Sequence, residues 1–208
     1  MTKRIMLVLL AAFLVGPSIA QQSPAEKPAL NTATEKQPYY AFYPSAKGQS
    51  HKRFQHNIFG LSVDIPANWI FGVNGTPPTA VVFLYPEGLT VSSFSPDYET
   101  IELGQLLPVK PSLEEAQKLV MSGMQSKHPN ITTITRPTKT VLNRRPAISW
   151  TFQWPSKSGY TVVEYVTLVQ DESRIRSIAV RTTRPDFSTR RKFYDEILTT
   201  LNFHSPKY

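Results

Sequence analysis

Arginine is the residue type whose clustering in this sequence most clearly suggests a chemical role. Of the 208 residues, positions 136–192 hold twelve basic side chains, nine of them arginine, against four acidic ones, whereas positions 53–135 hold four basic and seven acidic side chains. The guanidinium fork matches carboxylates and phosphates, which it binds through paired hydrogen bonds. We therefore expect one positive field that engages an acidic partner. Its candidate residues are Arg174, Arg176, Arg181, Arg184, Arg190 and Arg191.

The same arginines allow an interpretation without a partner. A charged sheet edge resists edge-to-edge aggregation, so these side chains could be a solvated, protective surface. Alternation along a strand would also place some of them on opposite faces. At the level of the sequence both interpretations stay open.

Two further side chains are candidates for contact with a ligand. Glu164 lies inside the apolar run Val162–Val166, where an ionised carboxylate needs a partner or water. We favour a cross-strand pair with an arginine at position 174, 176 or 181 over a ligand-binding role on an exposed sheet face. Trp150, Phe152 and Trp154 alternate as a core stripe under a helix does, and Trp154, at the strand end, is kept as a ligand contact.

The sequence lacks the patterns of common catalytic and metal sites. It has no cysteine, which excludes thiolate chemistry and disulfides. Its four histidines, at positions 51, 56, 128 and 204, have no metal-ligand spacing, and its nine glycines form no phosphate-binding loop. No Gly-x-Ser-x-Gly elbow is present, and Ser156 and Lys157 belong to a turn. We expect no catalytic residue, no cofactor, no metal and no enzymatic activity.

Residues 1–20 have the organisation of a secretory signal. Lys3 and Arg4 precede the apolar run Ile5–Val15, and Ser18 and Ala20 put small residues at a cleavage site. We expect cleavage after Ala20 and export to the periplasm or beyond; an uncleaved membrane anchor is the alternative. No later stretch is long and apolar enough to predict a transmembrane span in the mature chain. Because an exported protein does not meet chromosomal nucleic acid, the expected partner is an acidic protein or an anionic component of the envelope.

Residues 21–52 are predicted to form a polar, proline-rich linker. Four aromatic residues interrupt it: Tyr39, Tyr40, Phe42 and Tyr43. They could dock on a partner. Because aromatic area seldom stays in water, we favour a strap that lies on the protein's own domain.

Residues 53–204 are predicted to form a single domain, followed by a tail at 205–208. Apolar runs bounded by turn residues predict strands over residues 61–65, 69–73, 80–85, 90–94, 131–141, 147–154, 160–169 and 175–182. Pro137 marks one of them as an edge strand or the site of a bulge. A capping-box pattern from Ser112 to Glu115 begins a helix that Pro129 ends, and a second helix spans about 188–201. We expect an α+β fold, with an antiparallel sheet of about six or more strands flanked by two main helices.

The strand that opens this domain resembles the start of PsbP-like domains. The resemblance rests on the segment Gly60–Pro66 followed by Trp69, on Arg145–Ala147 before the aromatic strand, and on the closing segment Leu198–Phe203. That superfamily includes a photosystem extrinsic subunit, a Ran-binding nuclear-import factor and bacterial envelope proteins. The resemblance covers residues 54–204 and implies an α/β/α sandwich with a non-enzymatic binding or scaffolding role. Arg144 departs from it, because relatives often carry glycine there.

The sequence therefore predicts an exported, non-catalytic binding or accessory protein of the cell envelope. Its arginine-rich face and its aromatic segment are the expected contact surfaces. The alternative is a protein that binds a small ligand or a glycan in a groove between sheet and helix.

Overall fold

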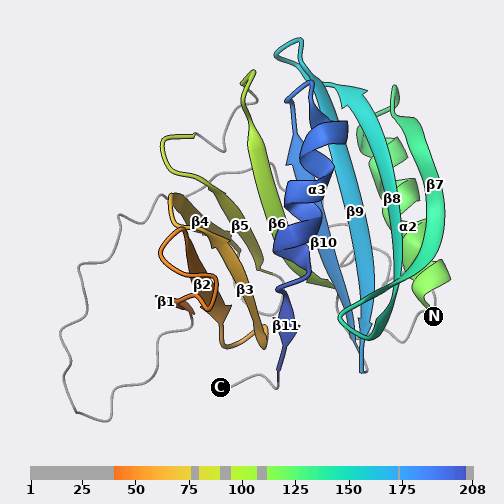
Figure 1. Ribbon diagram of the computed structural model, residues 1–208. Coiled ribbons are helices and arrows are strands. Elements are labelled where there is room, and N and C mark those ends of the chain that lie inside the picture. The colour runs from red at the N-terminus through yellow and green to blue at the C-terminus, as the bar shows by residue number, and fades with distance from the viewer. Residues whose placement is uncertain (1–39, 76–79, 90–94, 107–111, 173, 205–208) are drawn as a thin grey trace.

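The structure, a computed structural model, describes residues 40–75, 80–89, 95–106, 112–172 and 174–204. The predicted signal at 1–20, Tyr39, the strand predicted at 90–94 and the tail at 205–208 lie outside the described residues. Two antiparallel sheets and two helices make up the described part, which confirms the predicted α+β class (Figure 1). No helix in these ranges has the length and apolar character needed to span a membrane.

The smaller sheet has four strands in the order β1-β2-β3-β11, each antiparallel to its neighbour. Their bounds are Tyr40–Pro44 for β1, His51–His56 for β2, Leu61–Pro66 for β3 and Asn202–Phe203 for β11. The end of the predicted linker is thereby corrected. Residues 40–44 and 51–52 lie in strands, because the aromatic side chains of β1 find apolar neighbours on the domain.

The larger sheet has seven strands in the order β4-β5-β6-β10-β9-β8-β7, again antiparallel throughout. Their bounds are Trp69–Asn74 for β4, Val81–Pro86 for β5, Glu99–Leu106 for β6, Thr132–Leu142 for β7, Arg145–Pro155 for β8, Thr161–Asp171 for β9 and Arg174–Thr182 for β10. The strands predicted in these regions are confirmed. β6 is an additional strand, which the sequence patterns had not indicated.

β7 is an edge strand of the larger sheet, as its proline predicts (Figure 1). Its register with β8 shifts between Thr133 and Thr135 and again between Thr135 and Thr138, so Pro137 lies within an irregularity. A two-residue turn, Asn143 and Arg144, joins β7 to β8, and both residues have positive φ, 49° and 65°. Such values suit a type I′ turn, which fits the right-handed twist of the two strands.

Helix α2 (Leu113–Lys127) covers one face of the larger sheet over β8 and β9. The capping box begins it as predicted: the Ser112 hydroxyl accepts the Glu115 N–H at 3.2 Å, and the Glu115 carboxylate accepts the Ser112 N–H at 2.8 Å. The buried face of α2 packs on Trp150, Phe152 and Trp154, none more than 3% exposed. The predicted core stripe under a helix is therefore confirmed.

Helix α3 (Phe187–Leu198) and the smaller sheet cover the opposite face of the larger sheet. Tyr194, Ile197 and Leu198 of α3 join a core that includes Val63 of β3 and Val180 of β10. α3 ends before residue 201 because the chain turns into β11, which pairs with β3. The layers are thus α2, the larger sheet, and then α3 beside the smaller sheet (Figure 1).

Candidate functional site

Arg176 and Arg181 do not share a surface. Alternation along β10 puts them on opposite faces of the larger sheet: of the four residues between them, Ile178 and Val180 belong to the core on one face and Ala179 to the core on the other. The side chain of Arg176 is 2% exposed, and its Nε donates to Oδ2 of Asp171 at 3.1 Å. Its guanidinium carbon lies 6.0 Å from the ring centre of Phe203. This arginine is part of the interior.

Arg181 binds two buried carboxylates on the α2 side of the sheet. Its Nη1 lies 2.5 Å from Oε1 of Glu102, and its Nε donates to Oε2 of Glu164 at 2.7 Å. Glu164 and Arg181 face each other in the β9–β10 register, so the favoured cross-strand pair is present. Burial raises the pKa of Glu102 above its ordinary value, although the charge of Arg181 acts in the opposite direction. Trp154, whose ring centre is 5.8 Å from the guanidinium, is buried beside them.

Arg191 and Arg174 lie apart from Arg176 and from Arg181. The Arg191 Nε donates to Oδ1 of Asp195, one turn along α3, at 3.0 Å, and the guanidinium lies 3.6 Å from the ring centre of Tyr165. Arg174 begins β10 and is partly buried. The structure therefore does not bring the six arginines into one field, and internal partners take up most of their charge.

The aromatic segment, described from Tyr40 to Tyr43, packs on the domain with some of its rings and leaves others exposed. The ring centre of Tyr40 is 4.6 Å from that of Phe71, and the ring centre of Phe42 is 5.8 Å from that of Phe54. Phe42 and Tyr43 nevertheless stay 38% and 43% exposed. The segment thus behaves as a strap along one side and leaves two aromatic side chains at the surface.

Arg184 and Arg190 meet at a pocket, called here the Arg184 pocket. It lies among the turn after β3, the end of β5, the start of β6 and helix α3, and its volume is about 420 Å³. The residues that line it are Pro66, Asn68, Trp69, Pro86, Glu87, Leu89, Asp97, Glu99, Arg184, Arg190 and Phe193. Five of these eleven residues are charged, and apolar side chains such as Trp69 and Phe193 make up much of the rest, a mixture that can orient a polar ligand.

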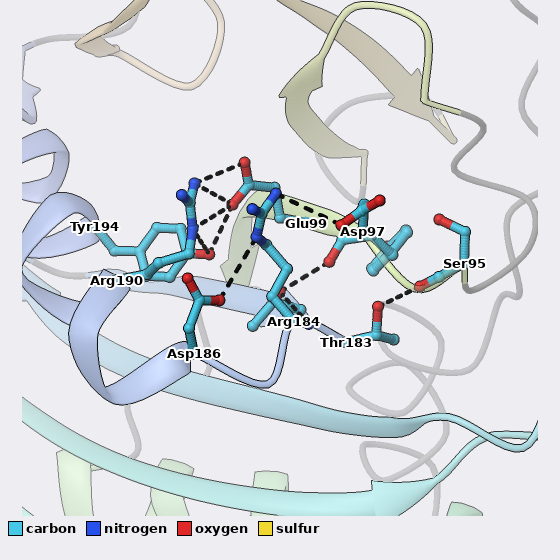
Figure 2. A network of polar contacts seen from close by, with 10 residues as sticks. Ser95, Asp97, Glu99, Thr183, Arg184, Asp186, Arg190 and Tyr194 are labelled. Carbon is cyan, nitrogen blue, oxygen red and sulfur yellow. Dashed lines mark hydrogen bonds and ion pairs between the residues drawn. The ribbon is translucent and has the colours of Figure 1, made fainter.

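Arg190 is held in place by Glu99 and Tyr194 (Figure 2). Its Nη2 donates to the two carboxylate oxygens of Glu99 at 2.9 and 2.7 Å, and its Nε donates to Oε2 at 3.1 Å. The Tyr194 hydroxyl donates to the same Oε2 at 2.8 Å. Burial, together with the charge of Glu99, raises the pKa of Tyr194 to about 12, so the phenol stays a donor at neutral pH. This triad forms a rigid, internally neutralised part of the pocket.

Arg184 has looser surroundings. Its Nε lies 3.6 Å from Oδ1 of Asp186 and its Nη1 lies 4.0 Å from Oδ1 of Asp97, both beyond an ordinary hydrogen bond (Figure 2). The backbone is anchored, because its N–H donates to Oγ1 of Thr182 at 3.0 Å. The Arg184 side chain is 30% exposed, against 75% for Asp97 and 48% for Asp186. The guanidinium therefore faces the pocket with its donors still available for stronger bonds.

Of the residues that line the Arg184 pocket, the sequence indicated only Arg184 and Arg190 as candidate site residues. Glu99 was missed together with strand β6, although Glu99, Ile101 and Leu103 share one face of that strand and an alternation count could have located it. The contact of Trp69 with Phe193 has no sequence signal, because only the fold brings β4 and α3 together.

The described ranges contain no group of three or more histidine, aspartate or glutamate side chains that could hold a metal ion. Two of the histidines lie against aromatic rings: His56 stacks on Phe59 with ring centres 4.2 Å apart, and His128 lies 4.4 Å from Trp154. Burial, followed by the charge of Arg176, lowers the pKa of His56 to about 4, so its imidazole is neutral. These two histidines are packed as structural residues.

Comparison with known proteins identifies the fold. Neither a family model nor a curated protein matches the chain. Among solved structures, the cyanobacterial PsbP protein CyanoP from Synechocystis sp. PCC 6803 is similar, with a TM-score of 0.53 and 9% identity over 78% of this chain and 98% of that one. The Ran-binding protein Mog1p from Saccharomyces cerevisiae has a TM-score of 0.48 and 12% identity over 80% and 96% of the two chains. LpqN from Mycobacterium tuberculosis, involved in cell envelope biogenesis, has a TM-score of 0.44 and 12% identity over 80% and 92%.

The similarity to CyanoP shows that this chain has the PsbP-like fold, which confirms the resemblance drawn from its strand and turn motifs. A shared fold does not carry a function with it. What the site does must therefore be argued from this chain's own side chains.

Proposed function

We propose that this chain is an exported, non-catalytic binding protein, and that its Arg184 pocket takes a carboxylate side chain from a partner protein of the cell envelope. The export signal predicted at residues 1–20 supports the location. An Arg–carboxylate contact with two parallel hydrogen bonds supplies both energy and orientation. The pocket, and not a broad arginine face, is then the contact surface.

The contrast between two neighbouring arginines carries this proposal. Arg190 has carboxylate oxygens of Glu99 at 2.7 to 3.1 Å, whereas Arg184 lies 3.6 Å from a carboxylate oxygen of Asp186 and 4.0 Å from one of Asp97. Asp97 and Asp186 hold the Arg184 guanidinium by charge without using its best hydrogen bonds. An incoming carboxylate can therefore bind Arg184 without first breaking a close internal pair.

The walls of the pocket favour an acidic residue with an apolar neighbour. Trp69 and Phe193 meet edge to face, with ring centres 6.1 Å apart, and line the pocket beside Arg184. Glu87 and Asp97 are exposed acids at the same pocket and would repel a run of carboxylates. We infer that the partner presents one carboxylate beside an apolar side chain, because a polyacidic tract would meet these two charges.

The same pocket supports a second candidate function. It lies between the ends of sheet strands and helix α3, which is where the alternative of a small-ligand groove would place a site. A volume of about 420 Å³ is within the usual range for ligand pockets. A small carboxylate ligand would use Arg184 in the same way as a partner's side chain.

Site-specific photo-crosslinking in cells that naturally make the protein tests the partner. The crosslinker replaces Asn68, which lines the pocket, and in a parallel strain it replaces Lys118, which lies exposed on α2. We expect one protein to be captured from the Asn68 position and not from the Lys118 position. Arg184→Gln should abolish the capture, because losing a charge-assisted bond of about 1.5–3 kcal/mol lowers affinity roughly tenfold to a hundredfold.

Lys157→Gln is the control, since it removes one exposed cation in the turn between β8 and β9, away from the pocket. Capture that survives Arg184→Gln and Lys157→Gln equally would contradict the proposal. If no protein is captured and a small carboxylate raises the melting temperature of the wild type but not of Arg184→Gln, the small-ligand function is the correct one.

A further inference from the structure

Strand β7 is the outermost strand of the larger sheet and is exposed along nearly its whole length. Every residue from Thr132 to Val141 is exposed, and only Leu142 is partly buried. A strand at a sheet edge carries backbone N–H and C=O groups with no neighbour on one side, so it can pair with another extended chain. β7 stands at the opposite end of the strand order from β4, which lines the Arg184 pocket, so the two surfaces are separate.

The hairpin register identifies which backbone groups of β7 face outward. The turn at residues 143–144 makes Leu142 and Arg145 the closing pair, which in a two-residue hairpin exchanges hydrogen bonds. Alternation then leaves Val141 and Lys139 with their backbone groups directed away from β8. Pro146 is opposite Val141, and its missing N–H fits this assignment. The regular register covers Thr138–Leu142 and ends at the irregularity that contains Pro137.

One strongly exposed apolar side chain lies in the regular part of β7. Val141 is 67% exposed, the highest value among the exposed large apolar side chains of the described residues, in a strand whose other exposed side chains are mostly threonine and cationic residues. A strand added beside β7 would cover Val141 and remove its apolar surface from water.

Charge selects the kind of chain that can pair there. Arg136 and Arg144 are exposed near the two ends of the regular segment, and Lys139 lies between them in an exposed ion pair with Glu114. Two copies of this chain paired antiparallel about Thr140 would bring the cations of both copies, Arg136, Lys139 and Arg144, to the same edge. Like charges close together destabilise a strand pair, whereas acidic residues at those places would stabilise it.

We propose that β7 is a second binding edge, which pairs over Thr138–Leu142 with an extended acidic segment of a partner protein. The outward N–H and C=O groups of Lys139 and Val141 provide the main-chain hydrogen bonds. Val141 packs against an apolar side chain of the added strand, and Arg136 and Arg144 contact its carboxylates. This mode of recognition is strand addition, in which main-chain bonds give affinity and side chains give selectivity.

The test uses the full mature chain and a capped synthetic peptide that alternates glutamate with valine. Hydrogen exchange followed by NMR should show slower exchange at the amides of Lys139 and Val141 when the peptide is added, while a peptide with lysine in place of glutamate has no effect. Val141→Pro removes one outward donor without touching a bond to β8 and should weaken binding about tenfold. Val141→Thr, which keeps the donor, is its matched control.

A charge-reversed variant keeps the test decisive if Val141→Pro perturbs the hairpin. Arg136→Glu combined with Arg144→Glu should lose the glutamate peptide and gain the lysine peptide. Unchanged exchange at Lys139 and Val141 with saturating glutamate peptide would overturn the proposal, and so would equal protection by both peptides. A dimer of the free protein that Val141→Pro dissolves would assign the edge to a second copy instead.

Discussion

At the scale of single residues, Arg181 is the arginine that pairs with two buried carboxylates. Its partners Glu102 and Glu164 have side chains that are 11% and 0% exposed, and the charge of Lys127 also acts on both. Arg181→Met removes these two ion pairs from buried carboxylates, and we expect a loss of about 3 to 5 kcal/mol in the free energy of unfolding. Urea denaturation of the purified protein measures it.

Two companion variants separate charge from packing. Arg191→Met removes a half-exposed ion pair with Asp195 and should cost about 1 kcal/mol or less. Adding Glu102→Gln and Glu164→Gln to Arg181→Met should recover part of the lost stability, because the uncompensated charges are gone. Equal losses for Arg181→Met and Arg191→Met would show that the buried carboxylates do not depend on Arg181.

His56 links the stability of the fold to pH. Burial and the charge of Arg176 lower its pKa from 6.5 to about 4 in the folded protein, so the unfolded chain takes up a proton first as pH falls. The contribution of neutral His56 is therefore complete above pH 6.5 and is lost progressively toward pH 4, to a total of about 3 kcal/mol. Glu102 acts in the opposite direction: burial raises its folded pKa above the ordinary value, so its contribution to stability grows as pH falls.

His56→Asn isolates the histidine effect. Asparagine keeps an acceptor for the Phe59 N–H, which His56 Nδ1 now accepts at 3.2 Å, and it does not titrate. We expect the unfolding free energy of the variant to fall less than that of the wild type between pH 6.5 and pH 4. Parallel pH profiles for the two proteins would mean that His56 is not the group responsible.

At the scale of the element, the turn between β7 and β8 carries strain that a single substitution should relieve. Arg144 adopts φ of 65°, a left-handed conformation that glycine adopts without the steric cost borne by a side chain. Type I′ turns favour the pair Asn-Gly for this reason. Arg144→Gly should therefore raise the unfolding free energy by about 0.5–1 kcal/mol in thermal or urea unfolding. Arg144→Ala, which keeps the left-handed strain without the charge, is the control and should give no such gain.

Elements with a strong local pattern could be predicted from the sequence, and elements defined by distant partners could not. The capping box at Ser112 and the alternation around Trp150 gave α2 and β8 correctly, because both depend on neighbours in the chain. β11 is two residues long and exists because β3 lies beside it, so it has no period to detect. β6 has an alternating pattern, but two of its buried side chains, Glu99 and Glu102, are acidic, so its sequence resembles that of a polar, exposed segment.

The candidate site shows the same division. The charge distribution along the sequence identified the arginines but not the carboxylates that pair with them. Glu99 and Arg190, for example, are 91 positions apart and become neighbours only in the fold. Alternation did indicate that some of the arginines would lie on opposite faces, and Arg176 and Arg181, five positions apart on one strand, are such a pair. Most of the positive charge of the C-terminal half is thus neutralised by ion pairs within the protein. Arg184 can be recognised as the more weakly paired arginine only once those pairs are known.

At the scale of the whole molecule, the boundary of the folded domain is the point where sequence and structure differ most. The predicted linker reaches residue 52, but β1 pairs with β2 over five residue pairs, from Tyr40 opposite His56 to Pro44 opposite Lys52. Tyr40 and Phe42 also cover Phe71 at ring-centre distances of 4.6 and 5.5 Å. β1 is therefore a part of the smaller sheet, although the sequence pattern predicts a linker there.

A pair of shortened chains tests this boundary. A chain that begins at Ser45 lacks β1, exposes the edge of β2 and uncovers Phe54 and Phe71, whereas a chain that begins at Tyr39 keeps all of these contacts. We expect the shorter chain to lose about 2 to 4 kcal/mol of unfolding free energy, since two aromatic side chains and a strand pairing are removed. It should also aggregate more readily, because a strand edge with apolar neighbours is left open. Identical urea unfolding curves for the two chains would restore the linker interpretation, in which everything before residue 53 is a tether.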